Sequence, residues 1–214
     1  MTIWFLTTNQ GKVDEARDYF SKHGIPVRQF EFEATEPQAD DLEVVALSKI
    51  EQAIPHLPDP NDMLLVEDAG LFIDALNGFP GVYSSYVLET LDVHGILKLM
   101  NHLQSEDPIQ DGNLRSAEFR AVAILYKNGQ TIVAEGVCPG RIAHEPVTGK
   151  GFGFDPIFIP ADLDDNGESL AIGEIGAQST HGKPFGGIPL EEKQLYSHRN
   201  RALENLLSNL DRLG

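Results

Sequence analysis

Residues 64–79 read LLVEDAGLFIDALNGF, an apolar run interrupted by two adjacent carboxylates. The apolar part, from Met63 to Val66, is typical of a strand that is buried on both faces. We expect this strand to end at Glu67 and Asp68. Ligands of open α/β sheets bind at the carboxyl ends of strands, so the stretch predicts such a sheet with a polar site at this strand end.

The two carboxylates allow two interpretations. Mg²⁺ takes one or two protein carboxylates and completes its coordination with water and substrate oxygens, so Glu67 and Asp68 could hold a metal that acts on phosphates. Alternatively, Asp68 caps backbone amides in a turn. The stretch on its own leaves both interpretations open.

The composition narrows the class of protein. The chain has 214 residues, and its hydrophobic content of 41% is that of an ordinary globular protein. No apolar run approaches the ~20 residues of a membrane span, so we expect no association with a membrane. The N-terminus lacks the basic flank of a signal peptide, and Cys138 is the single cysteine. We therefore expect a cytoplasmic protein.

The net charge is strongly negative. Thirty-three acidic residues against sixteen basic ones give a formal charge of −17. Such a field repels a nucleic-acid backbone, so we expect no nucleic-acid partner. A polyanionic small molecule would require a local basic pocket, a metal or both. The acids are scattered along the chain, which favours a role in solubility over a binding tract.

Strand and helix patterns alternate along the chain. Strands are predicted at 3–8 and 25–32, and helices at 12–23, 41–54, 91–104 and 199–213. The Asn128-Gly129 pair between the strand patterns 116–127 and 130–138 is a strong hairpin signal. No linker or repeat is present. The order predicts a mixed sheet with helices packed around it.

A strand-to-helix turn is formed by Thr7, Thr8, Asn9, Gln10, Gly11 and Lys12. Small side chains let backbone amides approach phosphates, the helix N-terminus favours anions, and Lys12 adds a cation. The same residue types also cap ordinary helices, so this turn alone is a weak signal.

An aromatic segment reads Gly151-Phe152-Gly153-Phe154-Asp155-Pro156. Phe152 and Phe154 could offer a ring face to a purine base, and Asp155 could accept a hydrogen bond from it. The alternative is a core strand whose glycines allow close packing.

A basic segment, Lys193 to Arg201, contains Ser197, His198 and Arg199 at the predicted start of the last helix. In so acidic a chain this cluster suggests an anionic ligand. The alternative is a helix cap with surface salt bridges.

Together with the 64–79 stretch, these segments resemble one family, the inosine triphosphate pyrophosphatases. Its motifs are Thr-x-Asn-x-x-Lys, Glu-Asp-(Ser/Thr)-Gly-Leu, Ala-Leu-x-Gly-x-Pro-Gly-x-Tyr-Ser, Gly-(Phe/Trp)-Gly-(Tyr/Trp)-Asp-Pro-x-Phe and Glu-Lys-Asn-x-x-Ser-His-Arg. The chain carries them in order from Thr7 to Arg199, which is nearly its whole length. It departs from them at Ala69, Phe154 and Gln194. An unusual insert, 182–189, precedes the last motif.

The resemblance implies the fold and the reaction. We expect one α/β domain over 1–214, with an elongated mixed sheet, flanking helices and two lobes around a central nucleotide-binding groove. The family hydrolyses non-standard purine nucleoside triphosphates (ITP, dITP, XTP) to the monophosphate and pyrophosphate with Mg²⁺. It also forms homodimers, so a homodimer is expected.

Roles follow from the resemblance residue by residue. Asp68 would accept a proton from the attacking water and bind the metal, with Glu36 as the second metal carboxylate and Glu67 as its rival. The substrate would contact the backbone of Ala69. The triphosphate would be bound by the 7–12 turn and by Lys12, Lys49 and Lys193.

The base would be recognised by its 6-oxo group, which accepts hydrogen bonds where adenine carries an amino donor. His198 and Arg199, which follow Ser197, would donate to this oxygen and so reject adenine. Phe152 would stack on the base, Phe154 would help line the pocket next to Gly153, and Asp155 would accept from the ring.

Two other functions are compatible with the residues. One is a pyrophosphatase of the same fold that acts on pyrimidine or modified nucleotides, as in the Maf family. The other is a catalytically silent nucleotide-binding protein, which Ala69 alone among the motif changes supports.

Overall fold

The structure is a computed structural model that describes residues 2–148 and 151–210. The chain divides into two compact units, each built from separate segments. Unit 1 comprises residues 2–69, 121–136 and 198–210, and unit 2 comprises 70–120, 137–148 and 151–197. The expectation of one domain over 1–214 stays a prediction.

One mixed sheet of seven strands forms the framework, with the order β2-β1-β3-β5-β6-β7 and with β4 paired to β3. The strands are β1 (Ile3–Leu6), β2 (Val27–Phe30), β3 (Met63–Ile73), β4 (Pro80–Gly81), β5 (Ser116–Lys127), β6 (Gln130–Ile142) and β7 (Phe158–Pro160). β1 runs parallel to β2 and β3, whereas β4 and β7 pair in antiparallel fashion with β3 and β6. The predicted mixed α/β sheet is confirmed; the elongated shape and the central groove stay predictions.

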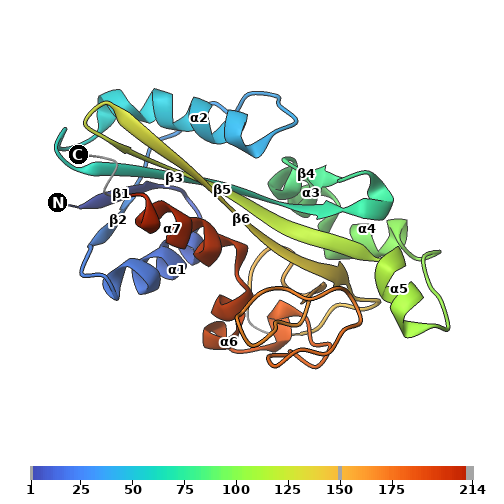
Figure 1. Ribbon diagram of the computed structural model, residues 1–214. Helices are drawn as coiled ribbons and strands as arrows, with labels where there is room; N and C mark the ends of the chain where they lie inside the picture. Colours follow the sequence, from blue (N-terminus) through green and yellow to red (C-terminus); the bar gives the residue numbers. More distant parts are fainter. Residues whose placement is uncertain (1, 149–150, 211–214) are drawn as a thin grey trace. The chain divides into compact units, whose positions relative to one another are not determined.

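Helices cover both faces of the unit 1 strands (Figure 1). α1 (Gln10–Ser21) and α7 (His198–Ser208) lie on one face, and α2 (Leu42–Ala53) lies on the other. β3 is buried at every residue from Met63 to Glu67, so alternate residues of this strand serve the two layers. Met63 and Leu65 belong to the core cluster that includes Phe20 of α1 and Leu203 of α7.

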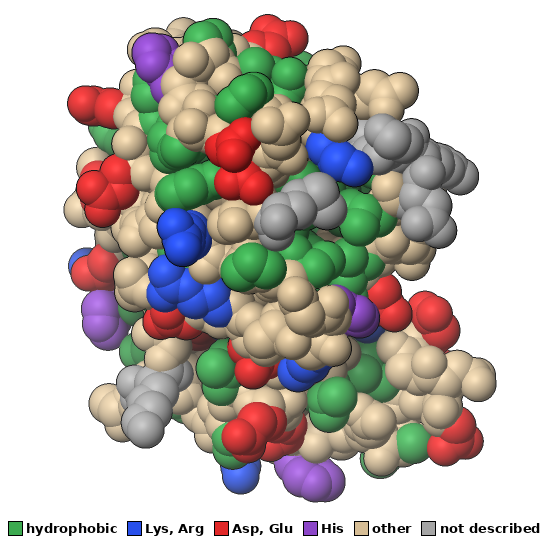
Figure 2. Space-filling view, turned by 90° about the vertical axis from the view of Figure 1, so that its left-hand side faces the viewer, with side chains coloured by type: hydrophobic (Ala, Val, Ile, Leu, Met, Phe, Trp, Pro, Cys, Tyr) green, Lys and Arg blue, Asp and Glu red, His purple; other side chains and the backbone are tan. Residues whose placement is uncertain are grey.

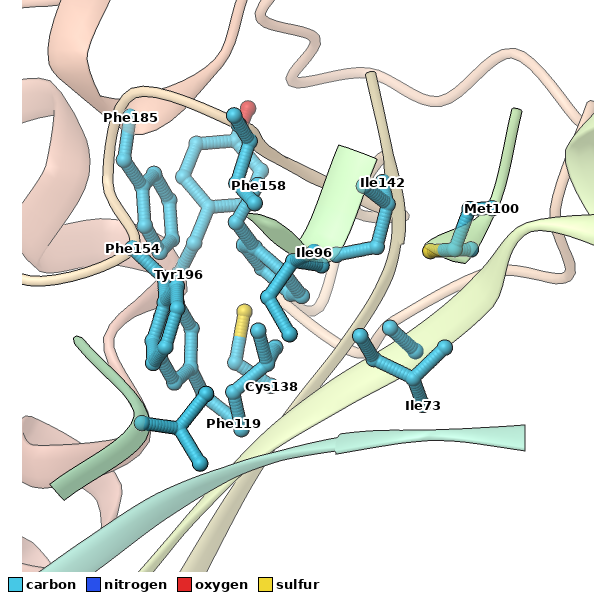
Figure 3. Packing of buried hydrophobic residues seen from close by; sticks show 14 of the residues in the cluster. Ile73, Ile96, Met100, Phe119, Cys138, Ile142, Phe154, Phe158, Phe185 and Tyr196 are labelled. Carbon is cyan, nitrogen blue, oxygen red and sulfur yellow. The ribbon is translucent and has the colours of Figure 1, made fainter. Parts of the chain in front are cut away.

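Unit 2 has its own hydrophobic core (Figure 3). Its helices are α3 (Ser84–Thr90), α4 (Asp92–Leu99), α5 (Pro108–Leu114) and α6 (Leu190–Tyr196). Aromatic rings dominate the core: Phe119, Phe154, Phe158, Phe185 and Tyr196 are all buried there. Three short 3-10 helices complete the described elements, at Ile54–His56, Asp74–Leu76 and Phe185–Gly187.

The structure corrects the predicted end of the third strand. β3 does not stop at Glu67 and Asp68 but continues to Ile73. It is β1 that ends there, because Leu6 pairs with Val66, and β3 later gains β4 as a partner from Leu71. The two carboxylates therefore lie inside a strand, beside the carboxyl end of its parallel neighbour.

Other helix and strand boundaries differ from the predicted ones by a few residues. β2 is shorter than the predicted 25–32, α1 begins two residues before Lys12, and α4 covers only part of 91–104. The hairpin around Asn128 and Gly129 is confirmed, and both residues have positive φ, as a tight turn requires. The predicted end of the last helix at 211–213 lies outside the described residues.

The surface carries its acids at separate places. Figure 2 shows carboxylate side chains spread over the face that it presents, with lysine and arginine side chains among them. In the described part of the chain, no helix is both long enough and apolar enough to cross a membrane.

Candidate active site

The turn before α1 is arranged to receive an anion. Asn9 caps the helix by accepting from the Lys12 backbone N at 3.2 Å, and Thr7 Oγ1 accepts from the Asn9 N at 3.1 Å. The first turn of α1 carries no acidic residue. Asn9 already accepts from the Lys12 amide, whereas the amides of Gln10 and Gly11 have no acceptor within the helix and are available to a phosphate. Ordinary helix capping was the alternative interpretation of this turn. The turn does cap the helix, and the same geometry is compatible with phosphate binding.

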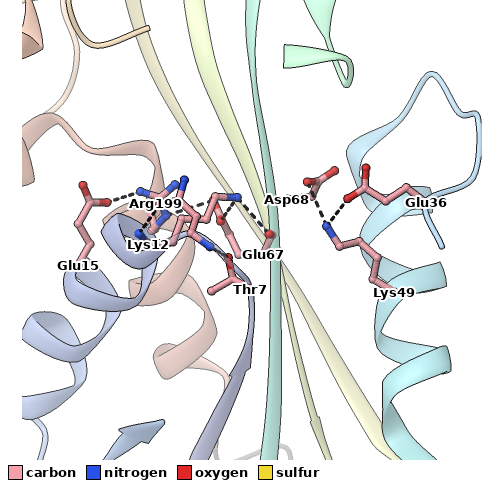
Figure 4. Close-up of polar contacts among 9 residues, drawn as sticks. Thr7, Lys12, Glu15, Glu36, Lys49, Glu67, Asp68 and Arg199 are labelled. Carbon is pink, nitrogen blue, oxygen red and sulfur yellow. Dashed lines mark hydrogen bonds and ion pairs between the residues drawn. The ribbon is translucent and has the colours of Figure 1, made fainter. Parts of the chain in front are cut away.

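Glu67 lies at the centre of a buried charge network in unit 1 (Figure 4). Its side chain is fully buried, with Lys12 Nζ at 2.7 Å and Arg199 Nε at 3.3 Å. Arg199 Nη1 also pairs with the buried carboxylate of Glu15. Burial would raise the pKa of Glu67, but the positive charges of Arg199 and Lys12 outweigh it and lower this pKa to about 2. Glu67 is therefore ionised at neutral pH and committed to two cations.

A second charge group joins Asp68, Lys49 and Glu36 (Figure 4). The Lys49 ammonium lies 2.7 Å from Glu36 Oε1 and 3.8 Å from Asp68 Oδ1. Burial raises the pKa of Asp68, although Lys12 and Lys49 oppose it. Burial would lower the pKa of Lys49, but Asp68 and Glu36 raise it above its ordinary value. The group combines a basic carboxylate with a cation that stays protonated.

The carboxylates fit a hard cation that keeps most of its own water. No group of three or more His, Cys, Asp or Glu side chains gathers at one place within residues 2–148 and 151–210. Mg²⁺ needs only one or two carboxylates, whereas Zn²⁺ or Ca²⁺ would need more protein ligands. Because Glu67 is occupied by Lys12 and Arg199, the pair Glu36 and Asp68 fits this role better than Glu67 does.

In unit 2 the aromatic segment forms a tight turn around Asp155 rather than a strand. Asp155 Oδ2 accepts from the Phe152 N and from Lys193 Nζ, both at 2.9 Å. The Lys193 ammonium also lies 4.6 Å from the centre of the Phe152 ring. A side chain at Gly151 (φ +139°) would place its Cβ 2.7 Å from Asp155 Oδ2, so the turn requires glycine there.

The predicted residues fall into two groups. The 7–12 turn, Glu36, Lys49, Glu67, Asp68, Ala69, His198 and Arg199 belong to unit 1, whereas Phe152, Gly153, Phe154, Asp155, Lys193 and Ser197 belong to unit 2. Lys193 contacts the aromatic turn, not the other two predicted phosphate lysines. Phe154 is a core residue, 3% exposed, although it was expected to line the pocket. Ser197 and His198 are both buried where α6 ends and α7 begins.

The sequence did not identify Glu15. It is 3% exposed on α1 and pairs with Arg199. Its only signal was its place beside the apolar positions 13 and 16, and in a chain with 33 acids that signal does not stand out.

The mixed sheet and these charge groups define an α/β protein with a candidate site for a phosphorylated ligand. A model of the Ham1 family matches residues 3–209, and the chain belongs to this family. The dITP/XTP pyrophosphatase of Thermococcus kodakarensis is 39% identical over 203 residues, which cover 95% of this chain and 94% of the relative. The dITP/XTP pyrophosphatase of Pyrococcus horikoshii is also 39% identical, over 204 residues with the same coverage.

Solved structures agree with this assignment. A HAM1 protein from Coxiella burnetii has a TM-score of 0.73 at 26% identity and covers 99% of this chain and all of its own. The Ham1 protein of Staphylococcus aureus has a TM-score of 0.70 at 26% identity, with full coverage of both chains. The resemblance drawn from the motifs is thereby confirmed.

Proposed function

We propose that this chain hydrolyses non-standard purine nucleoside triphosphates (ITP, dITP and XTP) to the monophosphate and pyrophosphate, and so removes them from the nucleotide pool. The observation that carries the proposal is the group of Asp68, Lys49 and Glu36, in the same unit as the anion-suited turn before α1. The names of the T. kodakarensis and P. horikoshii relatives support the same activity.

Unit 1 supplies the groups for phosphate chemistry. The 7–12 turn, Lys12 and Lys49 bind the triphosphate, and the substrate contacts the backbone of Ala69. Asp68 takes a proton from the water that attacks the α-phosphorus. The bond from the α-phosphorus to the bridging oxygen breaks, and pyrophosphate leaves. Mg²⁺, held by Glu36 and Asp68, would neutralise phosphate charge and orient the chain of phosphates.

The predicted site residues that do not bind the triphosphate recognise the base. Phe152 stacks on the base, next to Gly153 and Phe154, and Asp155 accepts from the ring. His198, after Ser197, donates to the 6-oxo group. Arg199, whose Nε and Nη1 face Glu67 and Glu15, donates to the same oxygen through its remaining N–H groups. The contacts of Lys193 with Asp155 and the Phe152 ring favour a place for it on the base rather than on the triphosphate. A site of donors for an oxo group leaves the amino group of adenine without an acceptor, which disfavours ATP.

The setting of the enzyme is also part of the proposal. A homodimer in the cytoplasm is what the family resemblance and the single cysteine support.

The test is pyrophosphate release from ITP, XTP, ATP, GTP, CTP and UTP, with Mg²⁺ or with a chelator, by the wild type and by Asp68→Asn. We expect fast, metal-dependent release from ITP and XTP that is lost in the variant. Release mainly from CTP or UTP would instead indicate a Maf-like enzyme. Binding of ITP without turnover would indicate a silent nucleotide-binding protein.

A further inference from the structure

The insert 182–189 is anchored in the core of unit 2 (Figure 3). Phe185 is 1% exposed, and its ring centre lies 5.3 Å from that of Phe158, 6.3 Å from that of Phe119 and 6.5 Å from that of Tyr196. Burying a phenylalanine side chain removes a large apolar surface from water and so stabilises the fold. The middle of the insert is therefore anchored in this core by the Phe185 side chain.

The next residue, Gly186, packs closely against the backbone of the Asp155 turn and forms a hydrogen bond with it. Its N–H donates to the Asp155 carbonyl oxygen at 2.8 Å. A Cβ at position 186 would lie 3.2 Å from Pro156 Cα and 3.3 Å from Pro156 N, which is tighter than ordinary van der Waals contact. The two backbones thus approach as closely as they do because residue 186 is glycine.

The Phe185 ring also faces the cation that Asp155 holds. Lys193 Nζ lies 5.6 Å from the centre of the Phe185 ring and 4.6 Å from that of Phe152, in addition to its 2.9 Å contact with Asp155. Lys193 is only 6% exposed. Because the Lys193 ammonium is buried, the faces of the Phe152 and Phe185 rings replace part of the hydration that it loses.

We propose that Phe185 and Gly186 are positioning residues that fix the Asp155–Lys193 pair in the geometry required for the base. Gly186 fixes the turn through its backbone, and Phe185 fixes the ammonium through its ring. The role of the insert is therefore base recognition rather than connection. This inference rests on the proposed function, because that function assigns Asp155 and Lys193 to the base.

The test compares Phe185→Leu with a matched control, Phe158→Leu. Phe158 is also fully buried and packs against the Phe185 and Phe119 rings, so both variants remove an aromatic ring from the same core. For Phe185→Leu we expect KM for ITP and the dissociation constant for inosine monophosphate to rise by about tenfold, with kcat nearly unchanged. The preference for ITP over ATP should fall in parallel.

For Phe158→Leu we expect a similar fall in Tm without these changes. Gly186→Ala is the second variant, and it should raise both constants without removing any ring. Equal effects of the two leucine variants on KM, or no effect of Phe185→Leu and Gly186→Ala, would overturn the positioning role alone. A wild type that neither hydrolyses ITP nor binds inosine monophosphate would overturn the proposed function as well.

Discussion

Glu67 shows how the surroundings of one residue decide its role. Two adjacent carboxylates look alike in the sequence, yet Glu67 is paired with Lys12 and Arg199, whereas Asp68 faces Lys49. The pKa of Glu67 falls to about 2 and that of Asp68 rises, because only Glu67 has enough positive charge close by to outweigh burial. The first carboxylate is held by two cations, whereas burial leaves the second with a raised pKa.

Glu67 should make the fold sensitive to acid. Its pKa is 4.5 in the unfolded chain and about 2 in the folded one, so its contribution is full above pH 4.5 and is lost as the pH falls toward 2. A shift of this size corresponds to about 3 kcal/mol. Glu67→Gln should lower the free energy of unfolding by about that amount at pH 7 and flatten its decline between pH 4.5 and 2. Urea unfolding across this pH range measures both effects.

The control for this prediction is Glu89→Gln, which changes an exposed carboxylate and should leave the pH profile as it is in the wild type. A Glu67→Gln protein with the wild-type acid profile would contradict the role given to this network.

Lys49 should compete with the metal in the free protein. Its ammonium lies beside both carboxylates that would hold Mg²⁺, so metal binding without nucleotide has to displace it. Lys49→Gln should bind Mg²⁺ about tenfold more tightly than the wild type in the absence of nucleotide, because one repelling charge is gone. Isothermal titration calorimetry with MgCl₂ measures this.

Lys98→Gln removes the same charge from an exposed position on α4 and should not change Mg²⁺ affinity. Equal Mg²⁺ affinities of the wild type and Lys49→Gln would mean that the Lys49 ammonium does not compete with the metal for the carboxylates.

At the scale of elements, periodicity and turn chemistry predicted most of the framework. The hairpin of β5 and β6 and the position of α2 followed from local signals, namely Asn128-Gly129 and an apolar repeat ended by Pro55. The continuation of β3 past Glu67 did not follow from local signals. It depends on where β1 ends and on Lys12 and Arg199, whose positive charges neutralise Glu67. Both factors come from other parts of the chain, so the sequence around Glu67 does not show them.

Arg115 connects three segments of unit 2, and its loss should be costly. It is 2% exposed, and its guanidinium donates to the carbonyl oxygens of Met100, Leu103, Ile142 and Ala143. Arg115→Met keeps much of the volume but leaves these acceptors without a donor, which should lower the free energy of unfolding by about 3 kcal/mol or more. Arg28→Met, at an exposed position whose side chain lies over Trp4, should cost less than about 1 kcal/mol in the same urea experiment. Equal losses would show that the carbonyls find other donors.

At the scale of the whole molecule, the motifs predicted a set of site residues but not how this set is divided between the two units. The resemblance implied two lobes, but the segments that make up each unit were not predictable, because each unit is assembled from segments that are far apart in the chain. Lys193 illustrates the result: the sequence grouped it with Lys12 and Lys49, but its partners are Asp155 and Phe152.

The net charge should make stability depend on salt. Acids outnumber basic residues by 33 to 16, so the folded protein repels itself most at low ionic strength. We expect Tm at pH 7 to rise as NaCl increases from about 0.1 M to about 1 M, where the Debye length falls from about 10 Å to about 3 Å. At pH 4.6, the isoelectric point of the sequence, this dependence should vanish. A Tm that is indifferent to salt at pH 7 would show that the acids are far enough apart not to interact.

The buried contacts of Arg199 have a consequence for biosynthesis. Glu15 and Glu67 are translated long before the arginine that neutralises both of them, and α7 also supplies core residues of unit 1. Unit 2 ends at residue 197, so every segment it needs has been translated before α7 is made. Unit 1 therefore stays open, with two unneutralised carboxylates, until its last helix has been made. Premature termination before residue 199 would thus yield a chain whose unit 1 cannot close.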